Sequence, residues 1–509
     1  MKFNILTRKK KQVINFEGAK AIKLSPEMEL YSAVVTAGLG NKFYTSEEKR
    51  ISRIRALICQ TDPEFVAKLA VYARTKMNLR SIPLVLITEL AKIHQGDSLV
   101  SNTVTSVIQR ADEITELLAC YAFANERTGY KKLNKLSKQI QKGLGNSFNR
   151  FDEYQFAKYD RQTEISLKDA LFLVRPKAES DSQQVIFNKI AEEQLATPYT
   201  WEVELSQTGQ VDYSTPQEKA DAFRNKWEEL IASNRLGYMA LLRNIRNILE
   251  AGVRAEYIEI AGNRIRSESE VARSRQLPFR FLSAYREIQK VENEFTSYFL
   301  DCLEEAVSYS ISNLKGFGLY TKILIACDVS SSMYCQLSPK SKIRCYDIGL
   351  LLGMLMNSKS KNVITGIFGS KWKPFSLPSK QILTNTQLLN SIEGSVGYST
   401  NGFKVISSLI KKGKVVDKVM MFTDCQMWDS SGGQNSIQKL WKEYKATIAP
   451  SAKLYLFDLA GYGNTPLKVE QNDVFLIAGW SDKIFDVLTA LENGESTLSQ
   501  IKSIKLNSD

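Results

Sequence analysis

The feature that most constrains the fold is a change in the spacing of apolar residues near residue 320. From there on, short and mainly apolar runs alternate with helical patterns, one of which covers Asp347 to Met356. Strands buried on both faces give such runs, and they are typical of a parallel sheet with helices on both sides. The runs are ILIACDVSSSM (323–333), VITGIF (363–368), VMMFTD (419–424), KLYLFDLA (453–460) and DVFLIAGW (473–480). We therefore predict a doubly wound α/β domain over residues 319–509.

Residues from about 26 to 310 repeat a different pattern of helix, short polar break and helix. Asp62-Pro63 and Thr215-Pro216 each supply a helix N-cap followed by a proline in the first turn. Short amphipathic helices that cannot each bury a face alone imply a stacked, solenoid-like array. A chain of 509 residues is too long for one core, so we expect a multidomain protein with this all-α part over residues 1–318.

The cysteine spacing and the apolar runs of the sequence indicate the cellular compartment of the protein. The seven cysteines are never spaced C-x-x-C, which argues against a disulfide framework or a structural zinc and favours a reducing environment. The N-terminal residues lack the apolar core of a secretory signal, and no apolar run is long enough to span a bilayer. We expect a cytoplasmic protein that makes no membrane contact.

The positive charge is unevenly distributed. The formal net charge is +13, to which residues 1–150 contribute 25 − 13 = +12, residues 151–320 contribute 21 − 27 = −6, and residues 321–509 contribute 22 − 15 = +7. Such asymmetry favours a polyanionic partner, most often nucleic acid. A basic surface that serves only solubility is the alternative.

The clearest basic segment is residues 131–150, which contain no acidic residue. The sequence predicts a helix there, with an apolar stripe of Leu133, Leu136, Ile140 and Leu144 on the opposite face. RNA phosphates would neutralise the basic stripe and release counterions, whereas the alternative is a solvated helix face. The predicted basic stripe consists of Lys131, Lys135, Lys138 and Lys142.

Basic character continues downstream among aromatic residues. Tyr154, Phe156 and Tyr159 could stack unpaired bases, or could belong to the core. The basic residues that accompany them are Lys158, Arg161, Lys168 and Arg175.

A cation site is predicted at the carboxyl edge of the sheet, where ligands bind in folds of this class. Carboxylates and hydroxyls from three loops suit a hard divalent cation, with Mg²⁺ expected and Mn²⁺ or Ca²⁺ as alternatives. Alone, Asp328 and Ser330 could simply cap a helix. The predicted ligands are Asp328, Ser330, Ser332, Thr400 and Asp424. They resemble the metal-ion-dependent adhesion site (MIDAS) of von Willebrand factor A domains, over roughly residues 320–490.

The helical part is similar to the TROVE module of the Ro autoantigen family, including its bacterial relatives. The stretches that carry the resemblance are DPEFVAKLAVYARTKMNLRSIPLVL (62–86), TPYTWEVELS (197–206), WEELIASNRLGYMALLRNIRNILEAGV (227–253) and SRQLPFRFLSAYREI (274–288). This implies a ring of HEAT-like helical repeats, closed by the A domain. It also implies binding of Y-like small noncoding RNA on a basic outer face that includes Lys158, Arg161, Lys168 and Arg175. Single-stranded ends of misfolded noncoding RNA would enter the ring.

The resemblance further implies a ribonucleoprotein role in RNA quality control, processing or decay. An exoribonuclease such as polynucleotide phosphorylase is a partner of bacterial relatives, and we expect a monomeric chain. Arg243 and Arg246 are candidates to face RNA inside the ring, or to pair with the acids of residues 151–320.

Catalysis is not expected. His94 is the only histidine, and no nucleophile motif accompanies it. The alternative function is a metal-dependent protein-binding scaffold, in which the A domain captures an acidic partner.

Overall fold

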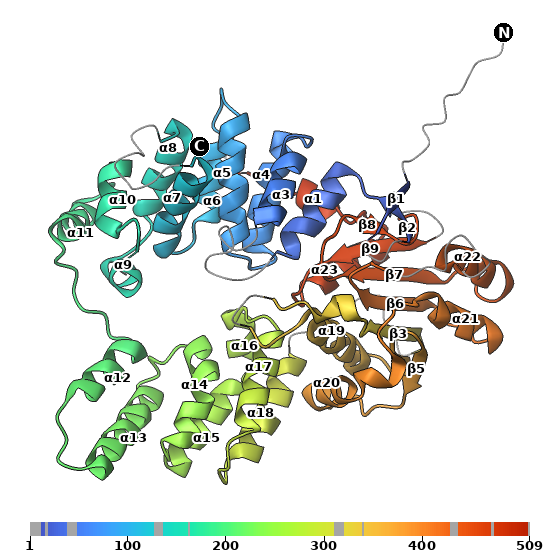
Figure 1. The fold of residues 1–509 in the computed structure, drawn as a ribbon. Coiled ribbons are helices and arrows are strands. Elements are labelled where there is room, and N and C mark those ends of the chain that lie inside the picture. The colour runs from blue at the N-terminus through green and yellow to red at the C-terminus, as the bar shows by residue number, and fades with distance from the viewer. Residues whose placement is uncertain are drawn as a thin grey trace. The chain divides into compact units, whose positions relative to one another are not determined.

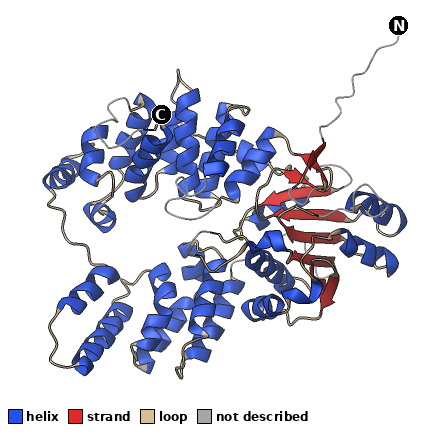
Figure 2. Cartoon of the chain, viewed as in Figure 1, coloured by secondary structure: helices blue, strands red, loops and turns tan. Residues whose placement is uncertain are grey.

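The computed structural model describes residues 12–15, 19–37, 48–126, 136–160, 163–309, 320–337, 341–427, 436–469 and 473–506. It divides into two compact units, which are treated separately below. The α/β unit comprises residues 1–37, 277–285 and 304–498, and the helical unit comprises residues 38–276, 286–303 and 499–509. Figure 2 shows strands only in the α/β unit and helices in both units. No described helix is long and apolar enough to cross a membrane.

The helical unit confirms the predicted array of short helices. Each helix packs mainly on helices one or two places along the chain, as in α4 with α5 and α6, α6 with α8, and α13 with α12 and α15 (Figure 1). The helices up to the middle of the unit are α3 (Glu48–Ile58), α4 (Pro63–Thr75), α5 (Ser81–Ile93), α6 (Leu99–Val107), α7 (Asp112–Ala124), α8 (Lys138–Phe148), α9 (Glu153–Tyr159) and α10 (Leu167–Val174). Those that follow are α11 (Asp181–Glu192), α12 (Trp201–Gln210), α13 (Pro216–Ala232), α14 (Tyr238–Glu250), α15 (Ala255–Ile265) and α16 (Glu268–Ser274).

Two further helices, α17 (Phe279–Ile288) and α18 (Thr296–Ser308), contribute residues to both units. The predicted helix starts are confirmed: the Asp62 side chain accepts a hydrogen bond from Phe65 N at 3.1 Å, and the Thr215 side chain accepts one from Glu218 N at 3.1 Å. Caps of this type satisfy amides that have no partner within the helix.

A partly buried ionic cluster joins α4, the start of α5 and α7. Arg74 lies 2.8 Å from Glu113, and Arg80 lies 2.9 Å from Asp112 and 3.3 Å from Glu116. Burial raises the pKa of Glu116 to about 7, the charges of Asp112 and Glu113 add to this, and Arg80 opposes it. These arginines therefore stabilise the packing of helices rather than extend a basic surface.

The α/β unit contains the predicted sheet, with strand order β5-β4-β3-β6-β7-β9. Neighbouring strands are parallel except for β5, which pairs antiparallel with β4 at the edge. The strands are β3 (Lys322–Asp328), β4 (Asn362–Phe368), β5 (Trp372–Phe375), β6 (Lys418–Thr423), β7 (Lys453–Asp458) and β9 (Val474–Ala478). All five apolar runs are confirmed as parallel strands, and β5 is an addition to the prediction.

Helices cover both faces of this sheet, as expected for a doubly wound domain. Figure 1 shows α21 (Phe403–Lys411) and α22 (Ile437–Thr447) on one face, with α19 (Cys345–Lys359) and α23 (Ile484–Glu492) on the other. The helix α20 (Ile382–Ser391) packs on α19. The predicted helix over 347–356 lies within α19.

The N-terminal segment packs with this sheet, a feature that the sequence does not predict. Strands β1 (Gln12–Ile14) and β2 (Lys20–Lys23) form a small antiparallel sheet with β8 (Asn464–Thr465), and α1 (Pro26–Val35) packs beside β9. The Tyr31 hydroxyl donates a hydrogen bond to Ala478 O at 3.2 Å. Contacts therefore group residues 12–37 with the α/β unit. The boundary predicted from the sequence, at residue 318, divides the chain by position in the sequence and places these residues in the helical part.

Candidate cation site and nucleic-acid interface

The predicted cation ligands meet at the carboxyl edge of the sheet. Asp328 ends β3, and Asp424 follows β6, the strand hydrogen-bonded to β3. Thr400 lies on the loop before α21. A hydrogen bond from Ser331 N to Tyr398 O, at 3.0 Å, joins this loop to the turn that follows β3. Asp328, Ser330, Thr400 and Asp424 are fully buried, whereas Ser332 is half-buried. The three loops thus bring two carboxylates and three hydroxyls to one edge.

Some of these oxygens already have protein partners. The carboxylate of Asp328 accepts hydrogen bonds from Ser330 N at 2.9 Å and from the Thr423 hydroxyl at 2.7 Å. The hydroxyls of Ser330 and Ser332 lie 3.3 Å apart. These contacts fix the carboxylate and the D-x-S-x-S turn in place.

Other oxygens fit a cation. Thr400 Oγ1 and Asp424 Oδ2 are buried and have no hydrogen-bond partner within the part of the chain that the structure describes. Leaving a buried carboxylate oxygen unpaired is costly. Burial raises the pKa of Asp424 to about 8, and the nearby Asp328 charge adds to the effect. Two buried carboxylates and hydroxyls with unused acceptors are a donor set that suits a hard divalent cation.

A third aspartate, Asp458, ends β7 at the same edge and was not singled out from the sequence. Its carboxylate accepts hydrogen bonds from the Ser32 hydroxyl at 2.5 Å and from Ala460 N and Gly461 N at 3.0 and 2.8 Å. Asp458 therefore holds α1 against the sheet. Among the described residues, no group of three or more His, Cys, Asp or Glu side chains is placed to bind a metal.

The predicted basic stripe is only partly within one helix. Helix α8 begins at Lys138 after the N-cap Ser137, so the single helix predicted over residues 131–150 is wrong in its start. Lys131 and Lys135 lie outside the described residues. Lys138 and Lys142 are exposed on α8, while Ile140 and Leu144 are buried, as the two-stripe pattern predicts.

The basic residues downstream differ in their partners. Lys158 on α9 and Arg175, which caps α10 at φ 51°, are exposed. Lys168 lies 3.4 Å from the Glu193 carboxylate. Arg161 lies outside the described residues.

The two arginines of α14 are exposed on its polar face. Arg246 pairs with Glu250 at 2.9 Å and with Glu287 at 3.5 Å, as the alternative of acid pairing anticipated. Arg243 forms no ion pair with any carboxylate that the structure describes.

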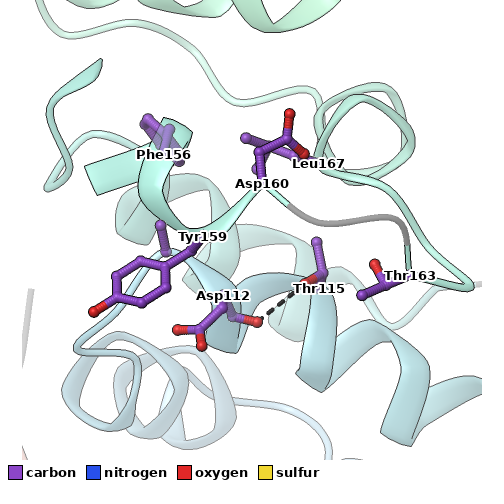
Figure 3. A pocket seen from close by; sticks show the side chains of 8 residues that line it. Asp112, Thr115, Phe156, Tyr159, Asp160, Thr163 and Leu167 are labelled. Atoms are coloured by element: carbon purple, nitrogen blue, oxygen red, sulfur yellow. Dashed lines mark hydrogen bonds between the residues drawn. The ribbon is translucent and has the colours of Figure 1, made fainter. Parts of the chain in front are cut away.

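The aromatic residues near Lys158 also differ in their burial and in their partners. Phe156 is buried and stacks on Phe148, so it belongs to the core. Tyr159 lies under the Arg110 guanidinium at 4.3 Å and lines a small cavity with Phe156 and Asp112 (Figure 3). The cavity volume of about 10 Å³ has room for about one water molecule and excludes an organic ligand.

Comparison with known proteins decides the family. The TROVE domain model matches residues 5–224 and 191–327, and the Ro60 vWA domain model matches residues 322–491. The chain belongs to the TROVE family. Proteins of the TROVE family are RNA-binding components of ribonucleoproteins.

Individual relatives are distant from this TROVE protein. The crystal structure of the Deinococcus radiodurans Ro (Rsr) protein matches with a TM-score of 0.59 and 17% identity, covering 92% of this chain and 100% of that one, which shows a shared fold. Telomerase protein component 1 of Mus musculus and of Rattus norvegicus are each 24% identical over 325 residues, or 48% of this chain. The chain spans only 12% of the length of these telomerase components.

Proposed function

We propose that this TROVE protein binds a Y-like small structured RNA on the basic surface formed by α8, α9 and α10. We further propose that single-stranded ends of misfolded noncoding RNA enter a ring of its helical repeats. The protein would act in cytoplasmic RNA quality control, processing or decay. The observation that carries this proposal is a set of exposed cations on consecutive helices of a TROVE module, among them Lys138, Lys158 and Arg175.

The physical basis is electrostatic. Lys138, Lys158 and Arg175 form no ion pair with a carboxylate in the described ranges, so their charges are available to phosphates. Each phosphate that they neutralise releases condensed counterions, which favours binding at low salt. Paired cations such as Lys168 must first leave their carboxylates.

The test compares three RNAs of equal length with the purified full chain. They are a hairpin with a single-stranded 3′ tail, the same hairpin with a blunt end, and an unstructured strand. The proposal predicts tightest binding of the tailed hairpin, because both of its parts are bound. Equal affinity for all three RNAs would contradict it.

A second candidate function concerns the α/β unit: metal-dependent capture of an acidic partner. The buried atoms Thr400 Oγ1 and Asp424 Oδ2, which lack a described hydrogen-bond partner, favour it. Together with Asp328, Ser330 and Ser332 they would hold Mg²⁺, Mn²⁺ or Ca²⁺. The bound cation would supply a coordination position for a carboxylate. An exoribonuclease such as polynucleotide phosphorylase is a candidate partner of the assembly.

Titration calorimetry of the full chain with Mn²⁺ tests this site. We expect one binding event, lost on Asp424→Ala and weakened on Thr400→Ala. RNA binding should be unchanged in both variants. The absence of Mn²⁺ binding to the natural chain would rule out the cation site and leave the RNA proposal standing.

A further inference from the structure

A pocket of about 620 Å³ opens within the helical unit, between α9, the segment before α12 and the segment after α13. Its volume falls in the range of roughly 300–1,000 Å³ that small-molecule sites occupy. Its lining includes Glu153, Tyr154, Pro198, Tyr199 and Arg235. The functions discussed above make no use of it.

Two tyrosines give the pocket aromatic surface held in a fixed orientation. Tyr154 is 47% exposed, and its hydroxyl donates a hydrogen bond to Tyr199 O at 3.4 Å. The Tyr199 hydroxyl donates to the Glu229 carboxylate at 3.1 Å. Because both hydroxyls are anchored, the rings are positioned before any ligand arrives, which lowers the entropic cost of binding.

Two cations accompany these rings. The Lys158 ammonium lies 5.7 Å from the Tyr154 ring centroid, and the Arg235 guanidinium lies 4.9 Å from the Tyr199 ring centroid. Neither forms an ion pair with a carboxylate of the described chain. The carboxylate of the lining residue Glu153 forms an ion pair with Lys189 at 2.7 Å and accepts a hydrogen bond from Ala196 N at 3.1 Å. The pocket therefore combines aromatic faces with positive charge that is not neutralised.

We propose that this pocket binds an unpaired nucleobase of bound RNA, stacked on Tyr154 or Tyr199. Lys158 and Arg235 hold the flanking phosphates. A π face beside a cation matches a base and its phosphate, and it accepts any base because every base has a π face. The proposal rests on the proposed RNA-binding function and adds a site at which single-stranded RNA is held.

The matched control is a similar tyrosine elsewhere in the helical unit. Tyr257 lies under the Arg254 guanidinium at 5.2 Å, but Arg254 is already held by the Glu228 carboxylate at 2.7 Å. Its cation is neutralised, so it lacks the feature that marks the pocket. Tyr257→Leu should leave RNA affinity unchanged.

The experiment measures affinity for a single-stranded RNA of about twelve nucleotides and for an abasic strand of the same length. Stacking is worth about 1–3 kcal/mol per base, so at least one of Tyr154→Leu and Tyr199→Leu, the one that removes the stacking ring, should weaken RNA binding about five-fold or more. Binding of the abasic strand should not change, and Tyr154→Phe should retain affinity for RNA. Lys158→Gln and Arg235→Gln should each lower the slope of log affinity against log salt by about 0.7.

The possible results separate the two proposals. If the natural chain binds RNA and both leucine variants bind it equally well, the pocket inference is overturned while RNA binding stands. If the natural chain binds neither strand, both proposals fail. Thermal unfolding of each variant checks that the fold is retained, and photo-crosslinking of 5-iodouridine RNA to Tyr154 or Tyr199, but not to Tyr257, would support the inference directly.

Discussion

Removing three exposed cations from the helical unit should change the salt dependence of RNA binding by a calculable amount. The perturbation is the triple substitution Lys138→Gln, Lys158→Gln and Arg175→Gln. None of the three forms an ion pair with a described carboxylate, and Lys138 contacts the neutral Gln141 side chain at 3.4 Å. Each can therefore neutralise a phosphate without first leaving a carboxylate of the protein.

The magnitude follows from counterion release. Each phosphate contact contributes about 0.9 to the slope of log affinity against log salt for a duplex and about 0.7 for a single strand, so three contacts contribute about 2 to 3. Between 50 and 200 mM salt, the natural chain should lose about 20- to 40-fold more affinity than the variant. Lys168 should contribute less than its neighbours, because Glu193 lies 3.4 Å from it.

Fluorescence anisotropy with a labelled structured RNA measures this slope. The control is Arg224→Gln, Lys226→Gln and Lys290→Gln, which removes the same formal charge from the same unit. Each of these residues is paired, at 2.6 Å with Asp221, 2.8 Å with Glu229 and 3.6 Å with Glu287. Equal slopes in the two triple variants would refute the reasoning, since net charge rather than local contacts would then determine binding.

Three further predictions concern the fold and the cation site. Mn²⁺ should raise the Tm of the natural chain, and Asp424→Asn should abolish this rise. The variant should leave the metal-free chain at least as stable, because it removes a carboxyl group whose ionisation is opposed by burial and by the Asp328 charge. Gly461→Ala should lower the free energy of unfolding in urea by about 2–5 kcal/mol, since φ is +69° and the new Cβ would lie 2.2 Å from Thr36 Oγ1. The control Gly413→Ala, at φ +55° with no atom within 4 Å of the new Cβ, should lower it by only about 1–2 kcal/mol. The folded-state pKa of Glu116, about 7, lies above its ordinary value of 4.5, so the folded state binds this proton more tightly. The unfolding free energy should therefore fall by up to about 3 kcal/mol as pH rises from about 4.5 to 7, and Glu116→Gln should remove that decline. The same pH dependence in the natural chain and in Glu116→Gln would show that this carboxyl has an ordinary pKa in the folded protein.

The sequence predicted the sheet, and it predicted that Asp328 and Asp424 lie at the carboxyl edge of that sheet, because both predictions depend on local patterns. An apolar run marks a strand buried on two faces, and the residue after it lies at the carboxyl edge whatever the rest of the chain does. This reasoning placed Asp328 and Asp424 together. Strand β5 was missed because its sequence, WKPF, includes a lysine and a proline, which an edge strand tolerates.

Long-range partners could not be predicted. The hydrogen bond from Ser32 to Asp458 joins residues 426 apart in sequence, and no local pattern marks it. The same limit applies to the pocket, since Tyr154, Tyr199 and Arg235 come from three separate segments. Helix α8 was predicted too long because the pattern of lysines and leucines at helical spacing begins before the N-cap Ser137 in the sequence.

The most direct test of RNA binding by this TROVE protein is sequencing of the RNAs that copurify with it after crosslinking in cells. We predict strong enrichment of a small structured noncoding RNA, and its loss from the triple variant of Lys138, Lys158 and Arg175. A copurified RNA population that matches total cellular RNA, or that is identical for the natural chain and the triple variant, would contradict the account.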